Sequence, residues 1–143
     1  MQEYLEFAAN NPMLMMGLGA VLGMIIWVEL QRLRNAGRNI SALEATRLQN
    51  SEDAVFVDVR DDKEYKRGHL PSSRHLPLSQ LDKRSHELEK FRQRPLILVC
   101  ETGARSQRAS VQLRKKGFEK VYNLTGGVGA WEKAQLPLTT RDK

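Results

Sequence analysis

The sequence of 143 residues has one cysteine, three histidines and five prolines, and it shows no internal repeat. A single cysteine excludes a disulfide framework within the chain, and three histidines add too few ligands for a cysteine-rich structural zinc site. With 41% hydrophobic and 28% charged residues, the composition lacks the bias of collagen-like, mucin-like or coiled-coil proteins. A chain of this length can hold one folded domain and an accessory segment.

Charge is also missing from one long stretch, because no ionisable side chain lies between Glu6 and Glu29. As a helix, residues 7–28 would rise about 33 Å, enough to cross a hydrocarbon core of about 30 Å. The acidic start of the chain is unlike a signal peptide, so we expect an uncleaved transmembrane anchor over residues 1–30. Gly19 and Gly23 form a GxxxG pair that would suit a homodimer or a membrane-protein partner.

The charges on the two sides of this span differ in sign. Glu3 and Glu6 precede it, whereas Arg32, Arg34 and Arg38 follow it. Because the basic side of a span normally stays in the cytoplasm, we expect a single-pass protein with its N-terminus outside. The bulk of the chain would then lie on the cytoplasmic side of a bacterial inner membrane.

The rest of the chain indicates one small α/β domain. We expect a basic juxtamembrane linker over residues 31–40, a domain over 41–137 and a tail over 138–143. Apolar runs rich in β-branched residues alternate with helical patterns, which is typical of a parallel sheet flanked by helices. The expected strands are 54–59, 96–100 and 121–124. A first helix is expected to begin after its cap at Ser41, and three further helices are expected over 81–91, 106–116 and 127–134.

Cys100 ends the second of these strands and is followed by the sequence Glu101-Thr102-Gly103-Ala104-Arg105. Ligands of open α/β sheets bind just beyond the carboxyl ends of strands, so a site is expected here. Backbone N–H groups of such a loop, together with the N-terminus of the next helix, would favour a thiolate on Cys100. Arg105 and Arg108 oppose the dipole of that helix, which predicts an anion nearby.

Three blocks of residues resemble the rhodanese family of sulfurtransferases. The first runs from Val57-Asp58-Val59-Arg60 through Glu64-Tyr65 and Gly68-His69-Leu70-Pro71 to His75-Leu76-Pro77. The second is the CxxGxR loop Cys100–Arg105, followed by Ser106. The third is Gly117-Phe118, Val121, Leu124-Thr125-Gly126-Gly127 and Trp131. The blocks stand in family order, and with its anchor the chain resembles membrane-anchored single-domain bacterial rhodaneses.

The resemblance implies a rhodanese-like parallel sheet and a persulfide intermediate on Cys100. It implies that a donor such as thiosulfate supplies sulfane sulfur and that a thiol or cyanide accepts it, with no metal and no organic cofactor. The loop residues Glu101, Thr102, Gly103, Ala104 and Arg105 would bind the anionic donor, and Arg60 would line the rim. His69 and His75 are expected to be ordinary hydrogen-bonded histidines.

Glu101 departs from the pattern, since many members of the family have a basic or neutral residue there. A carboxylate beside the cysteine could raise the pKa of the thiol and repel dianionic thiosulfate. One alternative function is a non-catalytic rhodanese-type module that recruits partners to the inner membrane. Another is a cysteine-dependent phosphatase, for which four residues between Cys100 and Arg105 make the loop one residue short. The net charge of +6 comes without interleaved aromatic residues, so nucleic-acid binding is not expected.

Overall fold

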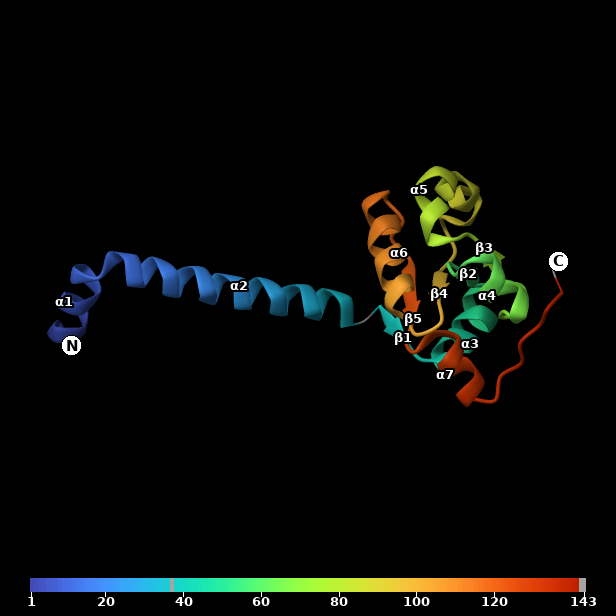
Figure 1. The fold of residues 1–143 in the computed structure, drawn as a ribbon, viewed down its shortest axis with the longest axis horizontal. Helices are drawn as coiled ribbons and strands as arrows, with labels where there is room; N and C mark the ends of the chain where they lie inside the picture. Colours follow the sequence, from blue (N-terminus) through green and yellow to red (C-terminus); the bar gives the residue numbers. More distant parts are fainter. Residues whose placement is uncertain (37, 142–143) are drawn as a thin grey trace. The chain divides into compact units, whose positions relative to one another are not determined.

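The computed structural model describes residues 1–36 and 38–141, and the chain divides into two compact units, Met1–Gly37 and Arg38–Lys143 (Figure 1). The first unit consists of helices α1, Gln2–Asn10, and α2, Pro12–Ala36. Proline lacks a backbone N–H and disfavours helical geometry in the residue before it, so the chain breaks at Asn11. The predicted span over residues 7–28 is therefore not one helix.

Helix α2 is long and apolar enough to cross a membrane over Pro12–Arg32, where the mean hydropathy is 2.0. Arg32, which lies in the part predicted as a linker, is 4.0 Å from Glu29, one turn earlier on α2. The helix continues into this part as far as Ala36, and Gly37 lies outside the described residues. Gly19 and Gly23 both lie on α2 with open space where a Cβ would be.

The second unit contains a five-stranded parallel sheet in the order β1-β5-β4-β2-β3 (Figure 1). The parallel sheet flanked by helices confirms the predicted fold class. All four residues of both β2 and β4 are buried, as a strand covered on both faces requires. The strands are β1 (Asn39–Ile40), β2 (Val55–Asp58), β3 (Arg74–His75), β4 (Leu96–Val99) and β5 (Val121–Leu124).

Two hydrophobic clusters cover the two faces of this sheet. Along β4, Leu96 and Leu98 belong to one cluster and Ile97 and Val99 to the other, which is the alternation expected of a strand. Cys100 continues the first of these sets. The covering helices are α5 (Leu81–Arg84), η2 (Ser85–Phe91) and α6 (Ala104–Lys115) on the Cys100 face, and α3 (Ala42–Glu52) and α7 (Gly127–Lys133) on the other face.

The remaining helices are α4, Asp62–Arg67, and the short 3₁₀ helix η1, Leu78–Gln80. Ser41 caps α3 with a reciprocal capping box to Glu44, which confirms the predicted helix start. The helix predicted over 81–91 is instead a short α-helix followed by a 3₁₀ helix. Its buried Leu88 and Phe91 lie three residues apart, a spacing that places them on one side of a 3₁₀ helix.

The segment predicted as a C-terminal tail, residues 138–143, is paired with the domain at Thr139. Thr139 forms an antiparallel bridge with His69, with backbone N–H to O distances of 2.8 and 2.9 Å. Trp131 donates its indole N–H to the carbonyl oxygen of Pro137 at 3.0 Å. The chain is thus held in place by the domain at least as far as Thr139.

Candidate active site

The loop after β4 is held in place by backbone hydrogen bonds from the N-terminus of α7. The backbone N–H of Val128 donates to the carbonyl oxygen of Cys100 at 2.9 Å, and that of Gly129 donates to the carbonyl oxygen of Glu101 at 3.3 Å. Gly127, directly before Val128, has a φ of +56°, and a Cβ on it would overlap the Cys100 carbonyl oxygen. In the sequence, Gly127 stands only as part of the third block of the family signature. The structure shows that a larger residue would not fit at this position.

The sulfur of Cys100 faces hydrogen-bond donors although the residue is only 1% exposed. The backbone N–H of Gly103 donates to Sγ at 3.0 Å, and the Ser106 hydroxyl lies 3.3 Å from it. Burial raises the pKa of the Cys100 thiol, but hydrogen bonds from the Ser106 side chain and from the backbone of Ser106, Gly103 and Thr102 outweigh burial. The net pKa is lower than that of an ordinary thiol, which favours the reactive thiolate.

Two of the predicted loop residues, Gly103 and Thr102, act on the sulfur of Cys100 through their backbone N–H groups. Gly103 precedes α6 with a φ of +99°, a conformation that suits glycine and aims its N–H at the sulfur. Thr102 is exposed, and its N–H contributes to the lowered pKa of Cys100. Ala104 is the exposed first residue of α6. The helix therefore begins two residues earlier than predicted, which places Arg105 firmly in its first turn.

Arg105 forms an ion pair with Glu64 of α4. Both of its terminal nitrogens donate to the carboxylate, each at 2.7 Å, in a bidentate arrangement. This pairing lowers the pKa of Glu64 to about 2. From the sequence, the anion near the first turn of α6 is expected to be the thiolate, its persulfide or a bound oxyanion, whereas the structure places the Glu64 carboxylate there.

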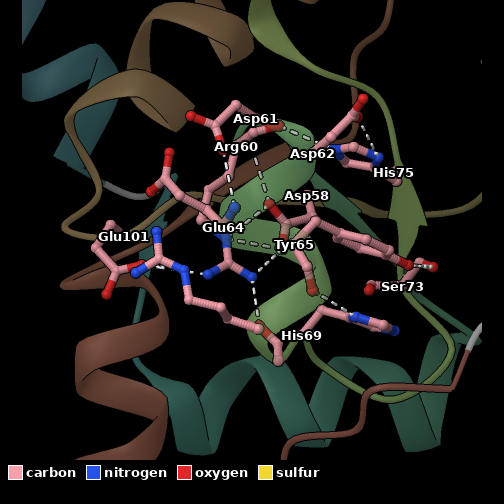
Figure 2. A network of polar contacts seen from close by, with 12 residues as sticks. Asp58, Arg60, Asp61, Asp62, Glu64, Tyr65, His69, Ser73, His75 and Glu101 are labelled. Carbon is pink, nitrogen blue, oxygen red and sulfur yellow. Dashed lines mark hydrogen bonds and ion pairs between the residues drawn. The ribbon is translucent and has the colours of Figure 1, made fainter.

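Arg60 is buried, with 3% of its side chain exposed, and connects three segments of the chain (Figure 2). It donates to both carboxylate oxygens of Asp58 at 2.8–3.1 Å and to the carbonyl oxygen of Gly68 at 2.7 Å. Its remaining terminal nitrogen lies 3.2 Å from the carboxylate of Glu101. Arg60 lies beside Glu101 of the loop, and its guanidinium is already used by partners within the chain, so its role at the rim stays a prediction.

Glu101 points toward Arg60 and has half of its side chain exposed. The sequence left open where this carboxylate would point. Its charge is balanced in part by Arg60, and the pKa of Cys100 is lowered rather than raised. Beside it is a cleft of about 360 Å³, lined by Arg60, Glu64, Arg67, Gly68, Glu101, Val128, Glu132 and Leu138.

The two histidines of the first block are hydrogen-bonded to backbone groups, as expected. A ring nitrogen of His69 lies 3.0 Å from the carbonyl oxygen of Tyr65, and one of His75 lies 2.9 Å from that of Arg60. Tyr65 stacks on both rings, with centroid distances of 3.8 and 4.1 Å, as Figure 2 shows. This stack holds α4, which carries Glu64, beside His75, whose ring is hydrogen-bonded to the Arg60 carbonyl oxygen.

Comparisons with known proteins agree with this geometry. A family model for the rhodanese-like domain matches residues 41–134. An uncharacterized protein of Escherichia coli K12, YibN, is 35% identical over 139 residues, covering 96% of this chain and 97% of YibN. The thiosulfate sulfurtransferase GlpE of Pseudoalteromonas translucida is 39% identical over 99 residues, covering 69% of this chain and 92% of GlpE.

A solved structure shares the fold over the same part of the chain. The crystal structure of a rhodanese-related protein from Thermoplasma volcanium aligns with a TM-score of 0.66 at 25% identity, covering 73% of this chain and 99% of that one. The sequence relatives and this structural neighbour match the part of the chain that carries the Cys100 loop. By its sequence, its fold and this loop, the chain belongs to the rhodanese family.

Proposed function

We propose that this protein is a membrane-tethered sulfurtransferase that carries sulfane sulfur on Cys100. The rhodanese-like domain and the GlpE relatives support sulfurtransferase activity at the level of the family. The observation that carries the proposal for this chain is the buried sulfur at the end of β4, which receives hydrogen bonds from Gly103 and Ser106. Such a sulfur is stabilised as a nucleophilic thiolate.

In the proposed first step, the Cys100 thiolate attacks the outer sulfur of a donor such as thiosulfate. A bond forms between Sγ and that sulfur, the sulfur–sulfur bond of thiosulfate breaks, and sulfite leaves with the bonding electron pair. The product is a Cys100 persulfide anion. The N–H groups of the loop and the positive charge of Arg105 would stabilise the developing anions.

In the second step, an acceptor thiolate or cyanide attacks the terminal sulfur of the persulfide. The bond between the two sulfur atoms breaks, Cys100 is released as a thiolate, and the acceptor leaves as a persulfide or as thiocyanate. The chain has no second cysteine that could resolve the persulfide as an internal disulfide. The acceptor must therefore come from outside the chain.

The charges at the site suggest that thiosulfate is a weak donor. Arg60 and Arg105 are both paired with carboxylates, and Glu64, Glu101 and Glu132 all line the cleft. The charged residues that line this cleft are these three glutamates and two arginines, Arg60 and Arg67, so a dianion approaching it meets a net negative charge. We propose that the physiological donor carries less negative charge than thiosulfate.

Helix α2 supports the tether. Its apolar side chains are exposed, including Met13, Leu18, Ile25 and Trp27, and bilayer insertion would remove this surface from water. With acidic residues before the apolar stretch of residues 7–28 and arginines after it, we propose that the rhodanese domain lies in the cytoplasm at a bacterial inner membrane. Retention of the chain in membranes after an alkaline carbonate wash, and protease protection in oriented vesicles, would test this.

Mass spectrometry of the full chain after incubation with a sulfane donor tests the activity. The purified protein would be treated separately with thiosulfate and with a low-molecular-weight persulfide. We expect the gain of one sulfur atom on Cys100 and its loss after addition of a thiol or cyanide. Cys100→Ser should gain none. A wild-type chain that takes up no sulfur from either donor would refute the proposal and favour a non-catalytic interaction module.

A further inference from the structure

Ser106 has one hydroxyl proton but three acceptors within reach. The sulfur of Cys100 lies 3.3 Å from its Oγ, the carbonyl oxygen of Gly103 lies 3.1 Å away, and the side-chain oxygen of Asn123 is the nearest of the three. The Gly103 carbonyl also accepts from the backbone N–H of Gln107 at 3.1 Å. A carbonyl oxygen can accept two hydrogen bonds, so the Ser106 proton is shared among all three acceptors, of which the Asn123 oxygen is the nearest.

Asn123 is well placed for this role. It lies on β5, is 6% exposed and has its backbone fixed by the sheet. Its amide nitrogen donates to the side-chain oxygen of Asn39 at 3.2 Å, which leaves its amide oxygen facing Ser106. No local pattern assigned a role to Asn123 or Ser106, because they lie on different elements, 17 residues apart.

We propose that Asn123 is a positioning residue for Cys100, because its amide oxygen competes with the cysteine sulfur for the single proton of Ser106. In the thiolate, Ser106 donates to the charged sulfur. In the persulfide, the negative charge moves to the terminal sulfur, and the Ser106 proton can return to Asn123. Asn123 thereby stabilises the persulfide relative to the free thiolate. The inference rests on the proposed role of Cys100.

The charged groups near the loop belong to other networks. Arg105 interacts electrostatically with Cys100 and is paired with Glu64, and Arg60 is paired with Asp58 and Glu101. Substitutions at Ser106 and Asn123 remove none of these side chains. The bordering charged residues are Asp58 of β2, Arg60 just after it, Glu64 and Arg67 of α4, Glu101 of the loop, Arg105 of α6 and Glu132 of α7.

Alkylation of Cys100 by iodoacetamide as a function of pH tests the proposal. The full chain in detergent has a single cysteine, so the adduct detected by mass spectrometry reports on Cys100 alone. Asn123→Leu frees the Ser106 proton for the sulfur, and we expect the thiol pKa to fall by about one unit. Ser106→Ala removes the donor, and we expect a rise of similar size.

The double variant distinguishes positioning from a general structural effect. Because Asn123 acts through Ser106, adding Asn123→Leu to Ser106→Ala should leave the pKa at the value of Ser106→Ala alone. Ser110→Ala is the matched control, since Ser110 is a buried serine of α6 whose hydroxyl donates to the Gln107 carbonyl. Its Cys100 pKa should equal that of the wild type.

A Cys100 pKa that is unchanged in Asn123→Leu would overturn the proposal. A raised pKa would also overturn it, because the amide nitrogen rather than the oxygen would then face Ser106. If Asn123→Leu does not fold, Asn123→Ala tests the same shift. Alkylation needs no sulfur donor, so opposite shifts in a chain that accepts no sulfur would support the shared proton while refuting the proposed activity.

Discussion

The ion pair between Glu64 and Arg105 should stabilise the domain, and its effect should depend on pH. The pKa of Glu64 falls from 4.5 to about 2 in the folded protein, chiefly through the hydrogen bonds from Arg105. At about 1.4 kcal/mol per unit, this shift corresponds to at most about 3.5 kcal/mol. The side chains of Arg105 and Glu64 are 37% and 18% exposed, so screening by solvent reduces the expected contribution to about 1–2 kcal/mol.

Glu64→Gln keeps the shape of the side chain and removes its charge. At pH 7 we expect the free energy of unfolding to fall by about 1–2 kcal/mol, which lowers the Tm of a domain of about 100 residues by about 5–10 °C. A folded-state pKa below the unfolded value gives stability that is present above pH 4.5 and lost as the pH falls toward 2. The gap between wild type and variant should therefore close over that range.

Thermal unfolding of the full chain in detergent, followed by circular dichroism between pH 7 and pH 2, measures both effects. Glu89→Gln is the matched control, because Glu89 also forms a bidentate ion pair, with Arg92, but this pair is exposed to solvent. Little change is expected there. If Glu64→Gln melted like the wild type at pH 7, or if its deficit were the same at pH 3, the reasoning from this ion pair would be wrong.

Three further changes test the loop and its surroundings. Arg105→Ala should slow sulfur loading from thiosulfate by one to two orders of magnitude, which stopped-flow loading kinetics would measure. It removes the charge-assisted hydrogen bond proposed to the departing anion, worth about 1.5–3 kcal/mol, and it leaves Glu64 without its partner Arg105. Glu101→Gln should raise kcat/KM for thiosulfate several-fold and reduce its dependence on salt, while a donor without net charge should respond little. Gly127→Ala should displace the Cys100 loop, lowering both the Tm and the rate of alkylation of Cys100, whereas Gly129→Ala, with more room for a Cβ, should be tolerated better.

Much of the fold could be predicted because its strands carry an unambiguous local signal. The run at 121–124 matches β5, and those at 54–59 and 96–100 contain β2 and β4, because continuous β-branched and apolar residues suit a strand buried on both faces. Gly117 has a φ of +91° after α6, a conformation that suits glycine at the C-terminal end of a helix. The position of Cys100 at a strand end followed from the same pattern.

The rest depended on tertiary contacts that no local pattern encodes. Glu64 and Arg105 are 41 residues apart, and only the fold determines that they meet rather than leaving Arg105 free for a ligand. Ser106 and Asn123 likewise meet only through the packing of α6 beside β5. The break at Asn11 did have a local signal in Pro12, but the uninterrupted apolar composition concealed it.

In the proposed reaction, the depth of Cys100 limits the shape of the molecule that takes up the sulfur. A sulfur atom added to Sγ would extend about 2 Å beyond it, so the transferable atom would lie closer to the mouth of the loop than the cysteine itself. A slender nucleophile, such as cyanide, a small thiol or a cysteine on a protruding protein terminus, could meet it there. A thiol recessed in a broad, flat surface could not.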